Sequence, residues 1–168
     1  MADAPREPEL RALDASFERP SAELVAGLAA LGPAALGDVL DPSCALRHEI
    51  RGLWPGAPRV AGPALTVRTG RHDNLMLHAA IYLAQPGDVL VVEAGCDEAA
   101  SAGGNVCAIA ARRGVRGLVV DGVVRDVAEM QAAGFPVFAR GVSPVPGRRV
   151  GAGSVASQIR CGGVVVDP

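Results

Sequence analysis

The chain has 168 residues, of which 49% are hydrophobic and 20% charged, and its formal net charge is −2. This length suits one globular domain with a core of its own. The near-neutral charge, with only three Phe, one Tyr and one Trp to stack on bases, argues against a nucleic-acid-binding protein. No segment approaches the roughly 20 apolar residues of a membrane helix, and residues 1–18 contain no secretory core. We therefore expect a cytoplasmic protein with no membrane partner.

All sixteen basic residues are arginine, so Schiff-base catalysis by a lysine and a lysine-containing P-loop are both excluded. The absence of a G-x-S-x-G motif leaves a serine hydrolase without its nucleophile elbow. The four cysteines form no C-x-x-C pair, which suggests neither a zinc cage nor a disulfide framework. We predict that they are reduced and mostly buried, with Cys96 in a loop that faces the site.

The first half of the chain is predicted to begin with a mobile arm, residues 1–20, followed by a single domain over residues 21–168. Within that domain, the spacing of apolar and turn residues predicts four elements over residues 21–84. These are a helix capped by Ser21 and ending near Leu31, a short helix over 34–40, a strand over 59–68, and a helix over 74–84 capped by Asp73 or Asn74. Gly62 and Pro63 imply a bulge or an edge position in the predicted strand.

The second half contains two successive strand, loop and helix units, which predict a parallel βαβ arrangement around a central sheet. In the first unit, a strand over 88–93 leads through Gly103-Gly104-Asn105 into a helix over 106–113. In the second, a strand over 117–121 leads through Arg125-Asp126 into a helix over 127–133. A short strand over 135–139, a Pro-rich loop over 141–147 and a Gly-rich β region over 150–166 complete the chain.

In open parallel sheets, ligands bind outside the carboxyl ends of the strands, so the two loops should lie side by side and form the site. A helix start attracts an anion, although a Gly-rich turn capped by Asn105 explains the first loop more simply. Arg125 either clamps a carboxylate through its guanidinium or is a surface arginine. Asp126 either holds a divalent metal or caps its helix together with Glu129. A helix start, a guanidinium and a carboxylate together favour a small carboxylic acid with Mg²⁺ or Mn²⁺.

Three further residues have both a functional and a structural interpretation. His78 is a catalytic base or, more simply, a histidine at the edge of the core. Asp73 is a helix cap or a residue that positions the side chains that contact the ligand. Asp121 orients Arg125 or merely starts a turn.

Five stretches of the chain form a recognisable pattern: RVAGPALTV at 59–67, DN at 73–74, PGDVLVV at 86–92, VVDGVVRD at 119–126 and GFPVFARG at 134–141. With these stretches, the sequence resembles the RraA-like family, which includes 4-hydroxy-4-methyl-2-oxoglutarate and 4-carboxy-4-hydroxy-2-oxoadipate aldolases. The resemblance extends from Ser21 to Pro168. It implies an α/β fold, an RraA-like swivelling β/β/α domain. It also implies a homotrimer or homohexamer with sites between subunits, and a divalent Mg²⁺ or Mn²⁺ ion.

By position, the resemblance implies that Arg125 binds the pyruvoyl carboxylate and polarises the keto oxygen. It implies that Asp126 holds the metal, and that the helix start at Gly104, Asn105 and Val106 binds the substrate carboxylate. The implied reaction is aldol cleavage to pyruvate and a 2-oxo acid, with oxaloacetate decarboxylation through the same pyruvate enolate. The same fold implies two alternatives, a non-enzymatic regulator that binds ribonuclease E, or a catalytically inactive member.

The chain departs from the family pattern at two places. Gly104 stands where the family often has an acidic residue twenty-one positions before the arginine. The chain also ends at Pro168, and we interpret it as lacking the C-terminal tail of the family. The second departure predicts weaker metal binding or assembly, and the first replaces a side chain that the resemblance implies to assist the metal-bound waters.

Overall fold

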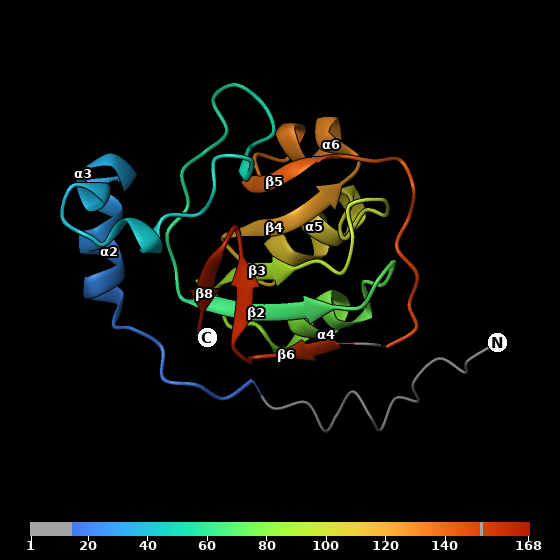
Figure 1. The fold of residues 1–168 in the computed structure, drawn as a ribbon, viewed down its shortest axis with the longest axis horizontal. Coiled ribbons are helices and arrows are strands. Elements are labelled where there is room, and N and C mark those ends of the chain that lie inside the picture. The colour runs from blue at the N-terminus through green and yellow to red at the C-terminus, as the bar shows by residue number, and fades with distance from the viewer. Residues whose placement is uncertain (1–14, 152) are drawn as a thin grey trace.

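The computed structural model describes residues 15–151 and 153–168, which form three layers. A six-stranded sheet in the order β1-β5-β4-β3-β2-β6 lies in the middle, with helices α4, α5 and α6 on one face (Figure 1). The hairpin of β7 and β8 covers part of the other face. The central sheet and its βαβ units agree with the α/β class predicted from the sequence.

Four parallel strands form the centre of the sheet, and a short antiparallel strand lies at each edge. The parallel strands are β2 (Ala64–Thr69), β3 (Val89–Glu93), β4 (Gly117–Val124) and β5 (Val137–Val142), and the edge strands are β1 (Arg51–Gly52) and β6 (Gly153–Val155). Their runs of Val and Leu are typical of strands that are buried on both faces. The parallel pair predicted from the two units is confirmed as β3 and β4.

The predicted strand over 59–68 was wrong at its start and in its edge position. β2 begins at Ala64 and lies between β3 and β6, so Gly62 and Pro63 precede the strand. A Cβ atom on Gly62 would lie 2.3 Å from the carbonyl oxygen of Gly87. Glycine is therefore required here for close contact between two backbones, which the sequence pattern does not distinguish from a bulge.

The main hydrophobic core lies between the sheet and its three helices, α4 (Leu75–Leu83), α5 (Gly104–Arg112) and α6 (Val127–Ala132). Alternate strand residues face this layer, among them Leu65, Leu90 and Leu118, which are at most 2% exposed. Leu77 of α4 is fully buried against them. Burying each such side chain contributes about 1.5–3 kcal/mol, so this layer fixes the helix starts relative to the strand ends.

A second, smaller core lies on the opposite face, where the hairpin of β7 (Ile159–Cys161) and β8 (Val164–Val166) packs on the sheet. Ile159 and Cys161 contact Val89 and Val91 of β3 in this cluster. The predicted Gly-rich β region over 150–166 thus consists of three short strands, β6, β7 and β8.

Helices α2 (Ala22–Leu31) and α3 (Pro33–Gly37) and the 3₁₀ turn η1 (Pro42–Cys44) project from one side of the sheet (Figure 1). The Ser21 hydroxyl accepts a hydrogen bond from the Leu24 N–H at 3.2 Å, which confirms the predicted cap. The second helix is shorter than the predicted 34–40, because it ends at Gly37. No residue of α2 is buried, and three of its leucines, Leu24, Leu28 and Leu31, are 42–60% exposed.

Residues 1–14 of the predicted arm lie outside the described residues, whereas its last part is anchored to the sheet. The Arg19 guanidinium donates two hydrogen bonds of 2.8 Å to the buried carboxylate of Asp88 and stacks over the Phe17 ring. This bidentate pair raises the pKa of Arg19. The described part of the arm, residues 15–20, therefore contacts the domain through Arg19, and an arginine in a charged segment gave no indication of this distant partner.

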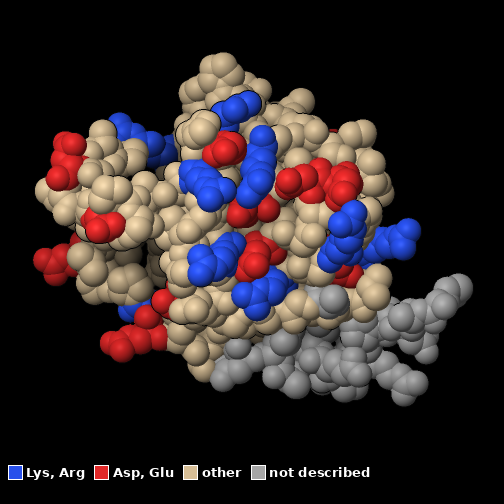
Figure 2. Space-filling view, viewed as in Figure 1, with Lys and Arg blue, Asp and Glu red and all other residues tan. Residues whose placement is uncertain are grey.

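The described residues include no helix that is long and apolar enough to cross a bilayer. Basic and acidic side chains alternate on the face shown in Figure 2 rather than forming a continuous basic surface. Ion pairs also join neighbouring strands of the sheet, including Arg68 of β2 with Glu93 of β3 and Arg140 of β5 with Asp121 of β4.

Candidate functional site

A cavity of about 190 Å³ lies at the carboxyl ends of the parallel strands, where the predicted loops meet. Gly103, Asn105 and Val106 at the start of α5 form one wall, and Arg125 and Asp126 after β4 form the next. The start of α4 and the loop after β5 complete it, through residues that include His78 and Arg149. The predicted juxtaposition of the two loops is therefore confirmed, and Gly104 itself is buried behind this wall.

The Asp126 carboxylate is held at the start of α5 and not at the start of its own helix. Its Oδ2 atom accepts a hydrogen bond from the Gly104 N–H at 3.1 Å and lies 3.3 Å from Nε of Arg125. Asp126 occupies the N-cap position of α6 in a left-handed conformation, φ 59°, and makes no side-chain cap bond there. The interpretation of Asp126 and Glu129 as a capping box is thus wrong, because the left-handed backbone turns the carboxylate towards the neighbouring helix.

The two glycines at the start of α5, Gly103 and Gly104, make room for the side chains of Asp126 and Glu129. A Cβ atom on Gly103 would lie 2.5 Å from Oδ2 of Asp126, and one on Gly104 would lie 1.9 Å from Oε2 of Glu129. The Glu129 carboxylate thus occupies the space next to position 104, where the family pattern often has an acidic side chain. Sequence reasoning missed this placement of Glu129, which only the packing of α5 against α6 brings about.

The start of α5 offers free N–H groups to the cavity. The helix begins at Gly104 with Gly103 as its N-cap, so the predicted cap by Asn105 is wrong. The N–H groups of the first helical turn have no acceptor within the helix, and Asp126 takes only that of Gly104. Asn105 and Val106 both line the cavity and leave their N–H groups for an anionic ligand.

Arg125 is positioned by an irregularity in β4. The strand continues to Val124, so residues 122–124 belong to the sheet and not to the predicted loop. The register with β5 shifts between Val120 and Val123, and the Arg125 N–H then donates to the Ala102 carbonyl oxygen at 3.0 Å. The Arg125 side chain is 41% exposed beside the cavity, which leaves N–H donors of its guanidinium for a ligand.

Two buried polar atoms in the α4 wall have no hydrogen-bond partner among the residues described. They are Nε2 of His78 and Oδ1 of Asn74, and both residues line the cavity. Buried polar groups are almost always paired, so these two atoms indicate a polar ligand or water in the cavity. Burial lowers the pKa of His78, and the nearby Arg149 guanidinium lowers it further, against a smaller opposing effect of Asp73. The imidazole is therefore neutral at pH 7.

Arg149 adds a second guanidinium to the cavity wall that the sequence analysis did not consider. It lies in the loop between β5 and β6, in a run of two arginines that the pattern does not distinguish from surface charge. The sequence contains one indication that Arg149 could reach the site, namely that it follows the next strand along the chain after Arg125. With Arg125 and the start of α5, it makes the cavity suitable for a ligand with two carboxylates.

Asp73 and Asp121 make contacts outside the cavity. Asp73 is buried, caps α4 by accepting from the Leu75 N–H at 2.8 Å, and accepts from the N–H groups of Val150 and Gly151. It therefore anchors the loop that carries Arg149. Asp121 pairs with Arg140 and accepts from the Gly162 N–H at 2.7 Å, so these contacts do not direct it to Arg125.

The donor set at this site fits a hard divalent cation. Oδ2 of Asp126 is engaged by Gly104 and Arg125, whereas Oδ1 has no partner in the part of the chain that the structure describes. The side chain is 34% exposed, which leaves room for water ligands. Mg²⁺ is usually held by one or two carboxylates and keeps several waters, so one available carboxylate oxygen beside an open cavity suits it.

Comparison with known proteins identifies the family. The model of the RraA-like family, Aldolase/RraA, matches residues 33–168. The chain belongs to the RraA-like family. A relative from Halalkalibacterium halodurans, named "Putative 4-hydroxy-4-methyl-2-oxoglutarate aldolase", is 39% identical over 134 residues, which cover 79% of this chain and 63% of the relative. The chain thus spans less than two thirds of that relative.

Two solved structures support the RraA-like fold. One is RraAS2 from Streptomyces coelicolor, described as an unusual member of the RNase ES inhibitor RraA protein family. It superimposes with a TM-score of 0.77 at 29% sequence identity, and the match covers 91% of this chain and 80% of the RraAS2 chain. The other is the RNA-processing inhibitor RraA from Thermus thermophilis, which superimposes with a TM-score of 0.71 at 29% sequence identity. The match covers 80% of this chain and 82% of the inhibitor chain. The RraA-like α/β fold predicted from the sequence is therefore confirmed.

Proposed function

We propose that this RraA-like protein is a divalent-metal-dependent pyruvate aldolase. Its substrate would be 4-hydroxy-4-methyl-2-oxoglutarate or 4-carboxy-4-hydroxy-2-oxoadipate, cleaved to pyruvate and a 2-oxo acid. The observation that carries the proposal is the convergence of Arg125, Asp126 and the start of α5 on one cavity. The aldolase name of the relative from H. halodurans supports the same reaction class. Because the chain contains no lysine, an aldolase of the Schiff-base type is excluded.

The substrate carries carboxylates at both ends, which matches the two anion-binding sides of the cavity. We assign the pyruvoyl carboxylate and the keto oxygen to Arg125 and to the N–H groups of Asn105 and Val106. Arg149 on the other side of the cavity would bind the distal carboxylate. Two fixed anchors hold the bond between C3 and C4 in one orientation, which is a large part of the rate advantage of such a site.

Cleavage requires removal of the proton from the 4-hydroxyl group, whose oxygen becomes the carbonyl oxygen of the released 2-oxo acid. As the C3–C4 bond breaks, its electron pair forms the C2=C3 bond of the pyruvate enolate and the C2=O π pair moves to the keto oxygen. Return of a proton to C3 then gives pyruvate. His78 is neutral and its Nε2 atom has no hydrogen-bond partner among the described residues, so it is the residue that we assign to this proton. The Arg125 guanidinium stabilises the negative charge that develops on the keto oxygen. An Mg²⁺ or Mn²⁺ ion bound at Asp126 would supply further Lewis-acid stabilisation of that charge. Oxaloacetate decarboxylation leads to the same pyruvate enolate and is proposed as a side activity.

The decisive experiment measures pyruvate release with a lactate dehydrogenase-coupled assay, with Mg²⁺ and with EDTA. Arg125→Ala should lower kcat/KM on the order of 10²-fold or more, because it removes a charge-assisted bidentate contact. Arg125→Lys should not restore activity, since an ammonium group cannot make two parallel hydrogen bonds. Arg112→Ala, at the opposite end of α5, is the matched control and should behave as the parent. Near-parent turnover of Arg125→Ala, or turnover unaffected by EDTA, would contradict the proposal.

A regulator of RNA processing is the second candidate, because both solved relatives described above carry inhibitor names. A regulator needs a protein-binding surface, and the exposed leucines of α2 provide apolar area for one. Metal-dependent pyruvate release favours the aldolase. Metal-independent binding to a ribonuclease E scaffold, with no pyruvate release, favours the regulator.

A further inference from the structure

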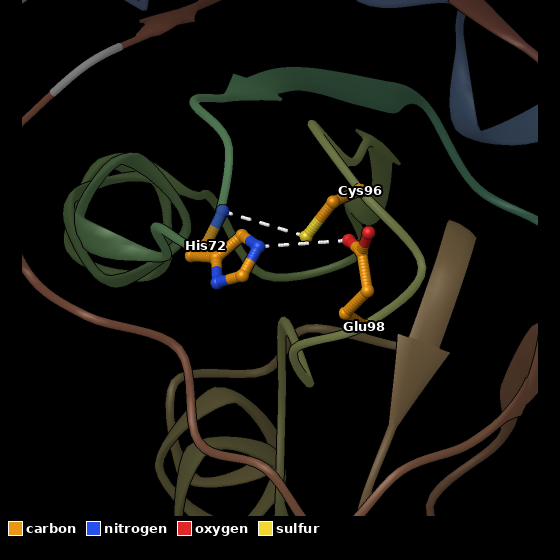
Figure 3. A group of neighbouring side chains, drawn as sticks. All are labelled: His72, Cys96 and Glu98. Atoms are coloured by element: carbon orange, nitrogen blue, oxygen red, sulfur yellow. Dashed lines mark hydrogen bonds and ion pairs between the residues drawn. The ribbon is translucent and has the colours of Figure 1, made fainter.

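A group of three potential metal ligands lies beside the cavity and is not explained by the proposed aldolase reaction. His72 lies in the loop after β2, and Cys96 and Glu98 lie in the loop after β3. Figure 3 shows their side chains converging between the two loops. One ligand atom from each residue lies within 4.8 Å of the other two. None of the three residues lines the cavity that contains Arg125 and Asp126.

The separations are close to those of a coordinated ion. Nε2 of His72 lies 3.6 Å from Oε2 of Glu98. Bonds of about 2.0–2.3 Å to zinc in a tetrahedron place neighbouring ligand atoms roughly 3.3–3.6 Å apart. The His72–Glu98 separation falls at the upper end of this range, and the Cys96 ligand atom lies within 4.8 Å of both.

The imidazole has an unmet requirement for a partner. Nε2 of His72 is buried and makes no hydrogen bond within the described residues; its contact with Glu98 is longer than a hydrogen bond. A buried polar atom without a partner is uncommon and indicates an ion or water at that point. The Sγ atom of Cys96 accepts a hydrogen bond from the His72 N–H at 3.4 Å, which holds it beside the same residue.

The backbone around the group is held in place before any ion binds. A Cβ atom on Gly95 would lie 2.4 Å from the carbonyl carbon of Gly70, so the two loops contact each other through their backbones. His72 is held at φ 57° and its carbonyl oxygen accepts from the Arg148 N–H at 2.6 Å. Such a conformation is uncommon for a residue other than glycine and needs support from its surroundings.

The second carboxylate oxygen of Glu98 is also engaged. Oε1 accepts from the Arg71 guanidinium at 2.8 Å, which leaves Oε2 directed towards His72. Partners of this kind orient a ligating carboxylate without occupying its metal-binding oxygen.

We propose that His72, Cys96 and Glu98 form a Zn²⁺ site that is separate from the Asp126 site. Nitrogen, thiolate and carboxylate ligands together favour zinc or a similar transition metal over Mg²⁺ and Ca²⁺, which prefer oxygen alone. Three protein ligands leave a fourth position for water or another ligand. Because Asn74 and Ala100 follow the group by two residues in each loop and line the cavity, the ion would fix two parts of the cavity wall.

The first test titrates the full-length protein with ZnCl₂ by calorimetry and with Co²⁺ as an optical probe. The parent should bind one Zn²⁺ per chain with release of the thiol proton, and Co²⁺ should give a thiolate-to-metal charge-transfer band. Cys96→Ser should lose this band, and His72→Asn should weaken Zn²⁺ binding on the order of 10²-fold or more. Asparagine is chosen because it tolerates the left-handed backbone of His72.

The control variants Cys44→Ser and His48→Asn change exposed residues outside the group, and Asp126→Asn changes the other metal site. All three should retain the parent's Zn²⁺ affinity. Absence of the band from the parent, its persistence in Cys96→Ser, or equal loss of affinity in Asp126→Asn would overturn the proposal.

A second measurement on the unmodified protein avoids dependence on folding of the variants. Alkylation by iodoacetamide, in which a cysteine thiolate displaces iodide, is followed at each cysteine by mass spectrometry. Zn²⁺ should slow the modification of Cys96 at least 10-fold and leave that of the exposed Cys44 unchanged. Equal rates at Cys96 with and without Zn²⁺ would overturn the proposal.

Discussion

Replacing Gly103 by alanine tests whether activity depends on the placement of Asp126 at the start of α5. The backbone of Gly103 is extended, with φ −145° and ψ −176°, so alanine introduces no conformational strain. The new Cβ atom would lie 2.5 Å from Oδ2 of Asp126, whereas ordinary contacts begin at 3.4 Å. The carboxylate must therefore retreat by close to 1 Å, the difference between these two distances.

A retreat of that size would break the contact between Asp126 and the start of α5. The 3.1 Å hydrogen bond from the Gly104 N–H would lengthen beyond hydrogen-bonding range. Arg125 would move as well, since the same Cβ atom would lie 3.1 Å from its Cγ and Nε atoms. We expect a stability cost of about 1–3 kcal/mol from overpacking. A displacement of 1 Å at a catalytic group costs on the order of 10²-fold in rate.

The assay combines kcat/KM for pyruvate release with thermal unfolding of Gly103→Ala. Gly37→Ala is the matched control, because a Cβ atom at Gly37 has no atom within 4 Å and the residue belongs to helix α3. The control should retain parent activity and melt at or slightly above the parent temperature. If Gly103→Ala retains both parent activity and parent stability, Asp126 is not held as described and the reasoning is refuted.

Three further predictions concern charge, pH and assembly. Asp126→Asn retains an oxygen that can accept from Gly104 but removes the charge that a hard cation prefers, so activity at limiting Mg²⁺ should collapse while the melting temperature changes little. Unchanged Mg²⁺ titration of turnover would eliminate the metal role. Because the pKa of His78 is lowered from 6.5, kcat/KM should be constant above pH 6.5. It should fall as the pH drops through the lower pKa of the folded state, where the imidazole becomes protonated. His78→Gln should abolish this fall at acid pH. The same shift lowers stability below pH 6.5, where the unfolded state binds the proton first. We also propose a homotrimer or homohexamer whose interface covers the exposed leucines of α2, so Leu28→Glu should reduce the mass measured by light scattering; a fully active monomer would contradict this.

The sequence was sufficient to predict the elements whose determinants are local. The periodicity of residues 74–84 and the apolar run at 88–93 predict α4 and β3 to within a residue or two at each end, and Ser21 marks the start of α2. The meeting of the two loops also follows from local patterns, because parallel strands end at one edge of a sheet. The position of a residue along its own element is therefore readable from the chain.

The partners of individual side chains could not be predicted in this way. Asp88 reads as the start of a strand, yet its carboxylate accepts from Arg19, 69 residues away. Asp121 reads as a neighbour of Arg125 along the chain, but it pairs with Arg140 on the adjacent strand. Each of these contacts depends on strand order and register, which the spacing of residues in one segment does not encode.

The same distinction explains why Gly104 is informative despite having no side chain. In the sequence, Gly104 stands at a position where the family often has an acidic residue. In the folded chain, Glu129 of α6 reaches the space that a side chain at position 104 would occupy, so the carboxylate enters from the neighbouring helix. Glu129 can therefore keep this position only with glycine at 104, since any larger residue at 104 would displace it. It follows that the acidic character beside Asp126 is a property of two packed helices, and that a motif compared position by position underestimates it.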